Sequence, residues 1–195
     1  IYTLSLHDAL PIYELGILGG VIMERLILYF SRAGENDFKG GIKFLEKGNT
    51  EVVAEKIRKI AGGTLFKVEP EIPYSDDYNI CLEETRRDIK ADARPKVKAI
   101  PSNMEKYDEV LILYPNYHNT FPMPMFTVLE QLSFQGKIIK PLCTHEGGGL
   151  GDSIADIEKI CKGAVIEEGL AIRGSYVDEC DHELELWLKK RSRKT

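Results

Sequence analysis

A set of polar residues suited to binding phosphate surrounds the predicted start of an early helix. Gly48-Asn49-Thr50 stands where an amphipathic helix, predicted over residues 50–61, begins, and Ser31-Arg32 ends the apolar run before it. A helix N-terminus presents free N–H donors and about half a positive charge, which suits an anion. Asn49 or Thr50 alone would more often be a simple helix cap, but the whole set favours a phosphate site. It is not a Walker loop, because no G-x-x-x-x-G-K-[ST] occurs.

A second group of chemically capable side chains follows another apolar run, at residues 115–120. Tyr117 offers an aromatic face on which a planar ligand can stack. His118 belongs to the residue type whose ordinary pKa is about 6.5, which suits proton transfer or contact with a ligand. The alternatives are an ordinary half-buried tyrosine and a surface histidine.

A glycine-rich loop, residues 144–152, follows a third apolar run and contains His145 and Glu146. Its glycines fail the spacing of the dinucleotide motif G-x-G-x-x-G, because Asp152 or Ile154 stands where the last glycine is required. We interpret the loop as flat backbone whose N–H groups contact the polar edge of a ring; the alternative is a flexible surface loop. HEGGG is not the zinc motif H-E-x-x-H, and no G-x-S-x-G supports a hydrolase.

A regular alternation of strands and helices must position these loops. The apolar patterns predict strands at 25–30, 64–68, 108–114 and 137–143, and a fifth strand region at 164–166 and 170–173. They predict helices at 50–61, 75–91 (with Ser75 as N-cap), 120–132, 153–161 and 177–191, with Leu184, Trp187 and Leu188 of the last helix facing the core. This order predicts one α/β domain, a parallel sheet covered by helices on both faces. In such sheets ligands bind beyond the carboxyl ends of the strands, where strand order reverses, and the three loops follow strands one, three and four.

Composition and charge limit the classes of function. The chain has 195 residues, of which 43% are hydrophobic, enough for one domain with a sizeable core. No apolar stretch approaches the ~18 residues of a membrane-spanning helix. The net charge is −5, and basic residues form a run only at 189–194, so we expect no nucleic-acid partner.

Cysteine usage indicates a reducing compartment. The spacing C-x-x-C occurs nowhere among the four cysteines, Cys81, Cys143, Cys161 and Cys180. We interpret them as free thiols and expect a cytoplasmic protein, although a bridge between two of them is an alternative. A metal site made by Cys143 with His118 and His145 is an alternative that we disfavour.

Residues 1–22 differ from the rest of the chain. They fit neither a signal peptide nor a transit peptide, and the stretch 3–12 resembles translated sequencing-adapter DNA. Met23 is followed at once by a strand pattern. We therefore expect 1–22 to be a non-native leader and 23–195 to form the domain; the alternative is a genuine N-terminal segment.

The first loop resembles the phosphate loop of the flavodoxin family, interrupted by an insertion. Residues 30–34 (FSRAG) and 48–50 (GNT) match the two halves of the family's pattern, and residues 35–47 separate them. We expect this insertion to fold outward near the ligand, with Phe38 and Phe44 as apolar anchors, but its role is open.

The other two loops resemble the same family, in the right order. Tyr107-Asp108-x-Val110 is similar to the start of its third strand, and residues 115–122 (PNYHNTFP) take the place of its P-x-W-W-G-T-x-P loop. Residues 137–151 (KIIKPLCTHEGGGLG) are similar to its G-K-x-x-x-P-x-x-T-H-x-G-S-G-x-G stretch. The chain departs from the pattern at Tyr117-His118 and at Asn119, which stands where glycine is common; asparagine tolerates positive φ well.

The resemblance implies a flavodoxin-like three-layer sandwich with a five-stranded parallel sheet of order 2-1-3-4-5, and FMN as cofactor. The phosphate would lie at the first loop, bound by Ser31, Arg32, Asn49 and Thr50, and the ring between the other two loops. The residues that it implies for cofactor binding are Ser31, Arg32, Ala33, Asn49, Thr50, Pro115, Asn116, Tyr117, His118, Asn119, Thr144, His145, Glu146, Gly147, Gly148 and Gly151. It implies no catalytic side chain and no metal.

The implied function is redox chemistry carried by the flavin. We expect an oxidoreductase or electron carrier that transfers electrons between redox partner proteins. The main alternative is an NAD(P)H-dependent quinone reductase, which the modest acidity of the chain (net −3 without residues 1–22) keeps open. A flavin-free module that binds a protein is a weaker alternative, because the acidic residues of a receiver domain are absent after strands one and three. A homodimer is possible on sequence grounds alone.

Overall fold

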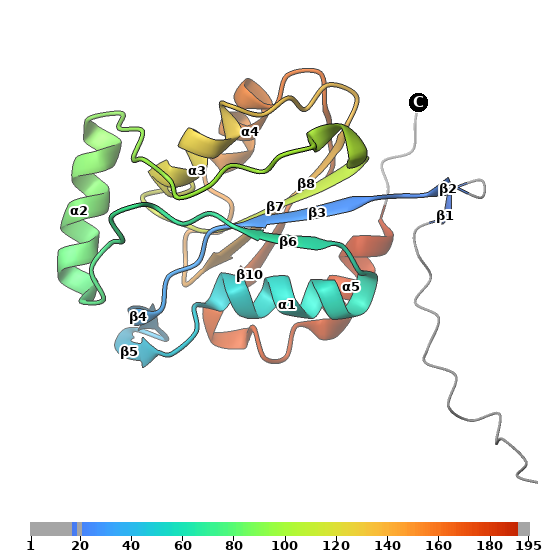
Figure 1. The fold of residues 1–195 in the computed structure, drawn as a ribbon. Coiled ribbons are helices and arrows are strands. Elements are labelled where there is room, and N and C mark those ends of the chain that lie inside the picture. The colour runs from blue at the N-terminus through green and yellow to red at the C-terminus, as the bar shows by residue number, and fades with distance from the viewer. Residues whose placement is uncertain (1–16, 19–20, 191–195) are drawn as a thin grey trace, which may run out of the picture.

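The computed structural model describes residues 17–18 and 21–190, and a parallel sheet forms the centre of this part of the chain. Its strands β6 (Thr64–Lys67), β3 (Arg25–Tyr29), β7 (Glu109–Pro115), β8 (Ile138–His145) and β10 (Leu170–Arg173) lie side by side in that order (Figure 1). In chain order this is 2-1-3-4-5, so the predicted fold is confirmed. The short strand β9 (Val165–Ile166) also pairs with β8, and the fifth strand region is therefore split, as predicted.

Two helices cover each face of the sheet. The helices α1 (Asn49–Ala61) and α5 (Asp181–Lys189) lie on one face, and α3 (Met123–Leu129) and α4 (Ser153–Ile160) lie on the other (Figure 1). This is the predicted three-layer arrangement. The helix α5 begins later than predicted, because the residues 177–180 form turns that follow the 3-10 helix η2 (Gly174–Tyr176).

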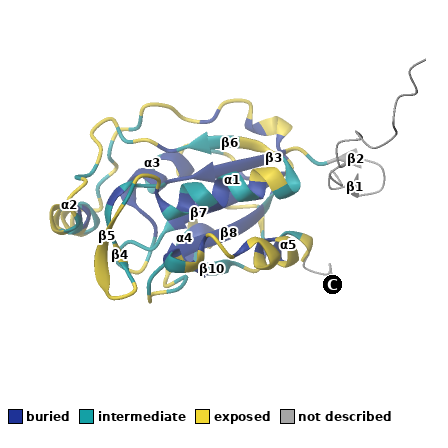
Figure 2. Ribbon diagram, turned by 90° about the horizontal axis from the view of Figure 1, so that it is seen from below, coloured by how far each residue is buried: buried dark blue, intermediate teal, exposed yellow. Residues whose placement is uncertain are grey.

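The strand β3 shows why the sheet needs cover on both faces. Every residue of β3 is buried. Leu26 and Leu28 pack with residues of α3 and α4, whereas Ile27 packs with residues of α1 and α5. Because successive side chains of a strand point to opposite faces, a continuous apolar run is stable only between two layers. Figure 2 shows this buried sheet covered by helices, of which α1, α4 and α5 have exposed residues and α3 has none.

The helix α2 (Tyr78–Lys90) stands beyond the carboxyl ends of the strands (Figure 1). Only Cys81 and Thr85 of this helix are buried. The predicted N-cap, Ser75, is wrong: Asp77 caps the helix, and its carboxylate accepts a hydrogen bond from the Ile80 N–H at 2.9 Å. This hydrogen bond fixes the N-terminal end of α2, and separate contacts hold its C-terminal end.

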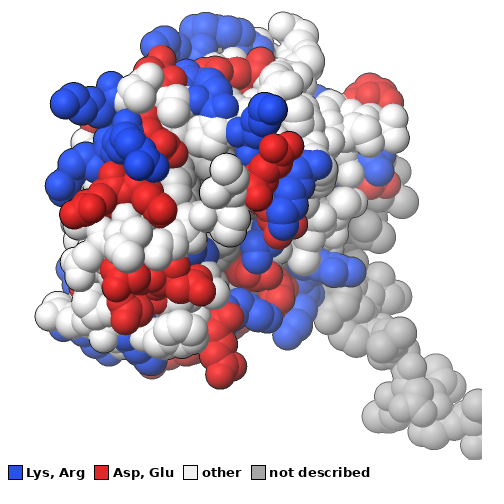
Figure 3. All heavy atoms as spheres, turned by 60° about the vertical axis from the view of Figure 1, so that its left-hand side comes forward, with Lys and Arg blue, Asp and Glu red and all other residues white. Residues whose placement is uncertain are grey.

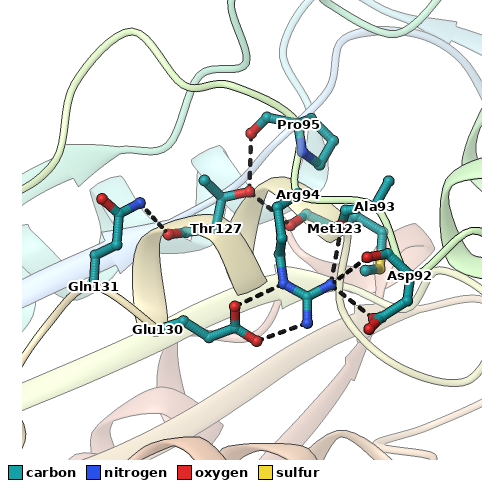
Figure 4. A network of polar contacts seen from close by, with 8 residues as sticks. All are labelled: Asp92, Ala93, Arg94, Pro95, Met123, Thr127, Glu130 and Gln131. Carbon is teal, nitrogen blue, oxygen red and sulfur yellow. Dashed lines mark hydrogen bonds and ion pairs between the residues drawn. The ribbon is translucent and has the colours of Figure 1, made fainter.

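Arg94 ties the chain after α2 to the end of α3. Its guanidinium makes two hydrogen bonds of 2.7 Å to the carboxylate of Glu130, after α3, and one of 2.7 Å to Asp92 (Figure 4). Thr127 of α3 donates to the Pro95 carbonyl at 2.9 Å. Two-point pairing of arginine with a carboxylate fixes orientation as well as distance. The helix α2 is therefore held at its C-terminal end.

We expect Asp77→Ala to lower the free energy of unfolding by about 1 kcal/mol, because an N-cap side chain satisfies a helix N–H that is otherwise unpaired. Chemical denaturation followed by circular dichroism measures the change. The control is Asp76→Ala, in which the neighbouring carboxylate makes no cap hydrogen bond and the backbone contacts of residue 76 persist. An equal loss in both variants would contradict the assignment of Asp77 as the cap.

The insertion between the two halves of the first loop is a β-hairpin. Its strands β4 (Gly34–Phe38) and β5 (Gly41–Leu45) pair antiparallel and project beside α2 (Figure 1). The prediction that Phe44 is an apolar anchor is wrong, because this side chain is 63% exposed. The residues 41–44 of β5 are all exposed, because a two-stranded hairpin has no second layer to cover it. Phe38 is half-buried, with Lys43 Nζ 4.3 Å from its ring centroid.

The remaining elements are short and lie outside the central sheet. The strands β1 (Ile17–Leu18) and β2 (Val21–Ile22) form a short antiparallel pair, and the 3-10 helix η1 (Met104–Lys106) precedes β7. The rest of the expected leader, 1–16 and 19–20, lies outside the described residues. No helix in the described part of the chain is long and apolar enough to cross a membrane. The four cysteines are buried free thiols, as predicted.

Candidate functional site

A cleft of about 380 Å³ opens at the carboxyl ends of β3, β7 and β8, where strand order reverses. Pockets that hold small ligands usually measure ~300–1,000 Å³. Of the residues predicted for the site, only Ala33, Asn119 and Gly151 do not line the cleft. Those that do are Ser31, Arg32, Asn49, Thr50, Pro115, Asn116, Tyr117, His118, Thr144, His145, Glu146, Gly147 and Gly148.

The start of α1 forms one end of the cleft. Gly48 is the N-cap residue, and its carbonyl accepts a hydrogen bond from the Glu51 N–H at 3.0 Å. Ser31 Oγ accepts from the same N–H at 3.1 Å, so Ser31 caps this helix through its side chain. A Cβ at position 48 would lie 2.2 Å from Ser31 Oγ, so only glycine fits. The first N–H groups of a helix have no intrahelical partner, and here they border the cleft at Asn49 and Thr50.

Two buried threonines join the first loop to the third. Thr50 Oγ1 and Thr144 Oγ1 are 2.8 Å apart, and either hydroxyl can be the donor. Both residues line the cleft. The sequence indicated both residues but not their contact, because nothing in a single chain reveals which side chains meet across a sheet edge.

Glu146 is tied to the turn that follows β10. Its Oε1 accepts from the Ser175 N–H at 2.6 Å, and its Oε2 lies 3.3 Å from Ser175 Oγ. The same turn approaches Asn49, because a Cβ on Gly174 would lie 2.1 Å from Asn49 Nδ2. The sequence prediction missed this support from Gly174 and Ser175. Glu146 therefore steadies the wall of the cleft through its carboxylate.

Arg32 connects four parts of the site. Its guanidinium donates to the Ser75 carbonyl at 2.8 Å, to the Asp76 carbonyl at 3.2 Å and to the Glu35 carbonyl. Its Nε donates to the Tyr117 hydroxyl at 3.2 Å. Arg32 thus joins the end of β3, the hairpin, the loop before α2 and the second loop. Most of its donors are used within the protein, which limits what remains for a phosphate.

The second loop is a tight two-residue turn. Tyr117 and Thr120 exchange backbone hydrogen bonds of 2.8 and 3.2 Å across it. The turn residues His118 and Asn119 both have positive φ, 51° and 75°, as in the type I′ turns of hairpins. Asn119 therefore tolerates the backbone conformation that was predicted to favour glycine. The left-handed conformation of His118 was not foreseen.

Asn119 and Gly151 lie behind the cleft and hold the second loop against the third. Asn119 Nδ2 donates to Asp152 at 2.6 Å, and the Asn119 carbonyl accepts from the Asp152 N–H at 2.7 Å. A Cβ on Gly151 would lie 2.2 Å from that same carbonyl oxygen. Asn116, which does line the cleft, donates from Nδ2 to the Gly149 carbonyl at 2.9 Å. These contacts make the two loops one unit.

Tyr117 places a half-buried ring in the cleft with its hydroxyl turned inward. Phe30 and Tyr74 pack edge-on or tilted against the ring, with centroids 6.1 and 6.5 Å away. Burial, and secondarily the nearby Cys81, hold the pKa of the Tyr117 phenol well above its usual value. The phenol therefore stays neutral, and Tyr117 offers aromatic surface rather than acid–base chemistry.

His118 is held as a neutral imidazole. Its Nε2 lies 2.9 Å from Thr85 Oγ1. The hydroxyl can also donate to the Cys81 carbonyl at 2.8 Å, and which group donates in the contact between Thr85 and His118 depends on the tautomer of the imidazole. Burial, and then the positive charge of Arg86, lower the pKa of His118. The residue thus ties the second loop to α2.

His145 carries a buried polar atom that has no partner. Within the described residues, nothing hydrogen-bonds to its Nδ1. Burial, and then Arg173, lower the pKa of His145, so the imidazole is neutral near pH 7. A buried polar atom without a hydrogen bond is costly. Because the atom is inaccessible in the open cleft, Nδ1 faces the protein interior, and His145 lines the cleft with its other atoms.

One wall of the cleft was absent from the sequence prediction. The helix α2 and the strand β4 supply its residues, which are Asn36, Asp37, Tyr78, Cys81, Leu82 and Thr85. In the sequence, residues 81, 82 and 85 have the spacing of an ordinary helix face that packs on a sheet. The only available signal was the length of the insertion before α1, which indicated that extra chain lies near the ligand.

The fold and the cleft define an α/β domain that binds a phosphate-containing cofactor at the switch point of its sheet. The sequence model of the flavodoxin family matches residues 42–191, which include the start of α1 and the second and third loops. The chain belongs to the flavodoxin family.

Solved structures agree with this assignment. The chain is similar to a candidate flavoprotein from Bacteroides eggerthii, with 25% identity over 86% of this chain and 99% of that one and a TM-score of 0.65. A flavoprotein from Lactobacillus acidophilus, solved in complex with FMN, is 21% identical over the same shares of the two chains, with a TM-score of 0.59. No curated protein matches the chain.

FMN is the cofactor of this family, and the residues of the cleft fit it. Gly48 leaves the start of α1 open to close approach, as a phosphate requires. Tyr117 supplies aromatic surface, and Gly147 and Gly148 bring backbone to the cleft, where it can contact a polar ring edge. We therefore expect FMN in this cleft. The start of α1 suits its phosphate, and the aromatic surface of Tyr117 suits its ring.

Proposed function

We propose that the protein binds FMN in this cleft and transfers electrons through it. FMN, when bound, supplies a ring that takes up and releases one or two electrons. The observation that carries the proposal is one continuous cleft that joins the N-terminus of α1 to Tyr117 and to the glycine-rich loop at Gly147 and Gly148. That cleft offers an anion site at one end and a hydrogen-bonding edge for a ring at the other.

In this proposal the chain's own residues bind and orient the cofactor. The N–H groups at Asn49 and Thr50 hold the phosphate, with Ser31 fixing the start of the helix. Tyr117 contacts the ring, and the backbone of Gly147 and Gly148 bonds its polar edge. The neutral state of both His118 and His145, which follows from their lowered pKa values, keeps positive charge away from the ring.

A second candidate function is an NAD(P)H-dependent reductase of small acceptors. The supporting observation is the wall formed by α2 and the hairpin, which borders the cleft beyond the three flavodoxin loops. Acidic and basic side chains are also interspersed on the side of the molecule where α2 lies, without a field of a single sign (Figure 3). Long-range steering of a charged protein partner is therefore weak.

The visible spectrum of the purified protein tests the proposal. We expect a yellow protein that releases FMN on denaturation, or a colourless one that takes up added FMN stoichiometrically. Reduction by dithionite and reoxidation by cytochrome c then test electron transfer. A protein that neither contains nor binds FMN would overturn the proposed function.

We expect Thr50→Val to weaken FMN binding about tenfold and to lower the free energy of unfolding by about 1–2 kcal/mol. The second effect follows because the buried Thr144 hydroxyl loses its partner and stays desolvated. Titration of flavin fluorescence and thermal denaturation measure the two effects. The control Thr50→Ser keeps the hydroxyl and should retain most of the affinity; equal affinity for all three proteins would remove Thr50 from the site.

A further inference from the structure

The tip of the hairpin contacts a turn that leaves the sheet at a different place. Lys39, in the turn between β4 and β5, has its Nζ 4.8 Å from the ring centroid of Tyr176, the last residue of η2. The hairpin follows β3 and η2 follows β10, and the strands β7 and β8 lie between these two in the sheet. The contact therefore bridges two separate segments at the N-terminal end of α1 (Figure 1).

The hairpin and η2 both border the end of the cleft that is proposed to hold the phosphate. Asn36 and Asp37 of the hairpin line the cleft together with Asn49. From the other side, Gly174 of η2 approaches Asn49 so closely that an added Cβ would lie 2.1 Å from its Nδ2. Glu146 ties η2 to the third loop. When the tip of the hairpin contacts η2, a continuous ring of protein therefore surrounds the start of α1.

The base of the hairpin is held more firmly than its tip. Glu35 accepts a hydrogen bond from the Tyr78 N–H at 3.1 Å through its carboxylate, and its own N–H donates to the Asp76 carbonyl at 2.8 Å. At the tip, Lys39 is exposed and Tyr176 is 49% exposed. A cation–π contact between exposed side chains is weak, and its loss shifts an equilibrium about two- to fivefold. The tip can therefore move away from η2 while the base stays in place.

Lys39 occupies a position that suits other residues better. The φ angle is 51° at Lys39 and 81° at Gly40, and a type I′ hairpin turn requires positive φ at both of its central residues. Asparagine or aspartate is preferred at the first of these positions, because lysine tolerates the left-handed conformation less well. The turn itself does not explain a lysine here, whereas the contact of its ammonium group with the Tyr176 ring does.

We propose that the hairpin, residues 34–45, is a flap over the phosphate end of the cleft, and that the contact between Lys39 and Tyr176 controls how fast FMN enters and leaves. The proposal rests on the proposed function, because it concerns the retention of the cofactor. Neither residue of the contact lines the described cleft, so the contact stabilises the closed flap equally with and without FMN. Weakening it then speeds entry and release by the same factor and leaves the Kd unchanged.

Tyr176→Ala and Lys39→Asn test the flap in the full-length protein. The second variant removes the cation and keeps a residue that suits the turn. FMN is mixed with excess flavin-free protein in a stopped-flow fluorimeter, and the observed rate is plotted against protein concentration. The slope gives the entry rate and the intercept the release rate. We expect both rates to rise about two- to fivefold in each variant at an unchanged Kd, with no further rise in the double variant.

Two controls isolate the ring and the cation. Tyr176→Phe keeps the aromatic face and should exchange FMN at the wild-type rates. Lys43→Asn removes a cation that lies over the Phe38 ring, at 4.3 Å from its centroid, and should also leave the rates unchanged. Wild-type rates in Tyr176→Ala or Lys39→Asn would overturn the flap, as would a rise in Kd that accounts for the faster release.

A measurement without flavin separates the flap from the proposed function. Trypsin cleaves after lysine, and we expect cleavage after Lys43 in the flavin-free protein to be faster in Tyr176→Ala than in the wild type or Tyr176→Phe. Equal cleavage in all three proteins would show that the contact does not hold the hairpin. If the wild type binds no FMN, both proposals fail. If it binds FMN and Tyr176→Ala exchanges FMN at the wild-type rates, the flap fails while the proposed function stands.

Discussion

Gly48→Ala is expected to weaken FMN binding at least ~100-fold, which corresponds to about 2.8 kcal/mol. The added methyl group would lie 2.2 Å from Ser31 Oγ and 2.4 Å from the Arg32 carbonyl oxygen. The second contact is with backbone, which cannot rotate away, so the start of α1 must move from the end of β3. The N–H groups proposed to hold the phosphate then lose their positions. Titration of flavin fluorescence measures the Kd.

Two comparisons make this result specific to the phosphate end of the cleft. In Gly41→Ala the new methyl group has no neighbour closer than the Phe38 carbonyl, at 4.0 Å, so its affinity for FMN should match the wild type. Riboflavin, which lacks the phosphate, should lose much less affinity than FMN in Gly48→Ala. Unchanged FMN affinity in this variant would show that the phosphate binds elsewhere.

The architecture was predictable because its signals are local and repeated. The residues 26–30 and 110–114 are continuous apolar runs, as a strand covered on both faces requires, and the structure has β3 and β7 there. The cap of α2 was not predictable in the same way. Ser75 and Asp77 are both good cap residues, and tertiary contacts decide between them, because Arg32 holds the carbonyls of residues 75 and 76 outside the helix.

The three loops of the site were predictable from topology, whereas its fourth wall was not. Residues after strands one, three and four must meet at one edge of a parallel sheet, which is why the predicted residues line the cleft. The placement of α2 depends on side chains that are distant in sequence, such as Thr85 and His118. No periodicity distinguishes a helix that packs on a sheet from one that borders a ligand.

Arg32 illustrates how a correct residue can be given an incomplete role. Its position after the first strand suggested a phosphate contact, because arginine is a common phosphate ligand. The guanidinium instead donates to three carbonyls and to the Tyr117 hydroxyl. These bonds connect the hairpin, the loop before α2 and the second loop. The three segments lie far apart along the chain. We therefore infer that Arg32 positions the wall of the cleft.

Arg32→Met is accordingly expected to weaken FMN and riboflavin by similar factors, about tenfold each, and to lower the free energy of unfolding by at least about 2 kcal/mol. The loss of stability follows because the hydrogen bonds of a charged guanidinium contribute ~1.5–3 kcal/mol each, and its carbonyl partners would be left unpaired. Arg32→Lys keeps the charge but loses the planar fork, so it should behave like Arg32→Met. Fluorescence titration with each flavin and chemical denaturation measure the effects. A phosphate ligand would give the opposite pattern, in which Arg32→Met weakens FMN alone, Arg32→Lys rescues it, and riboflavin binds all three proteins equally.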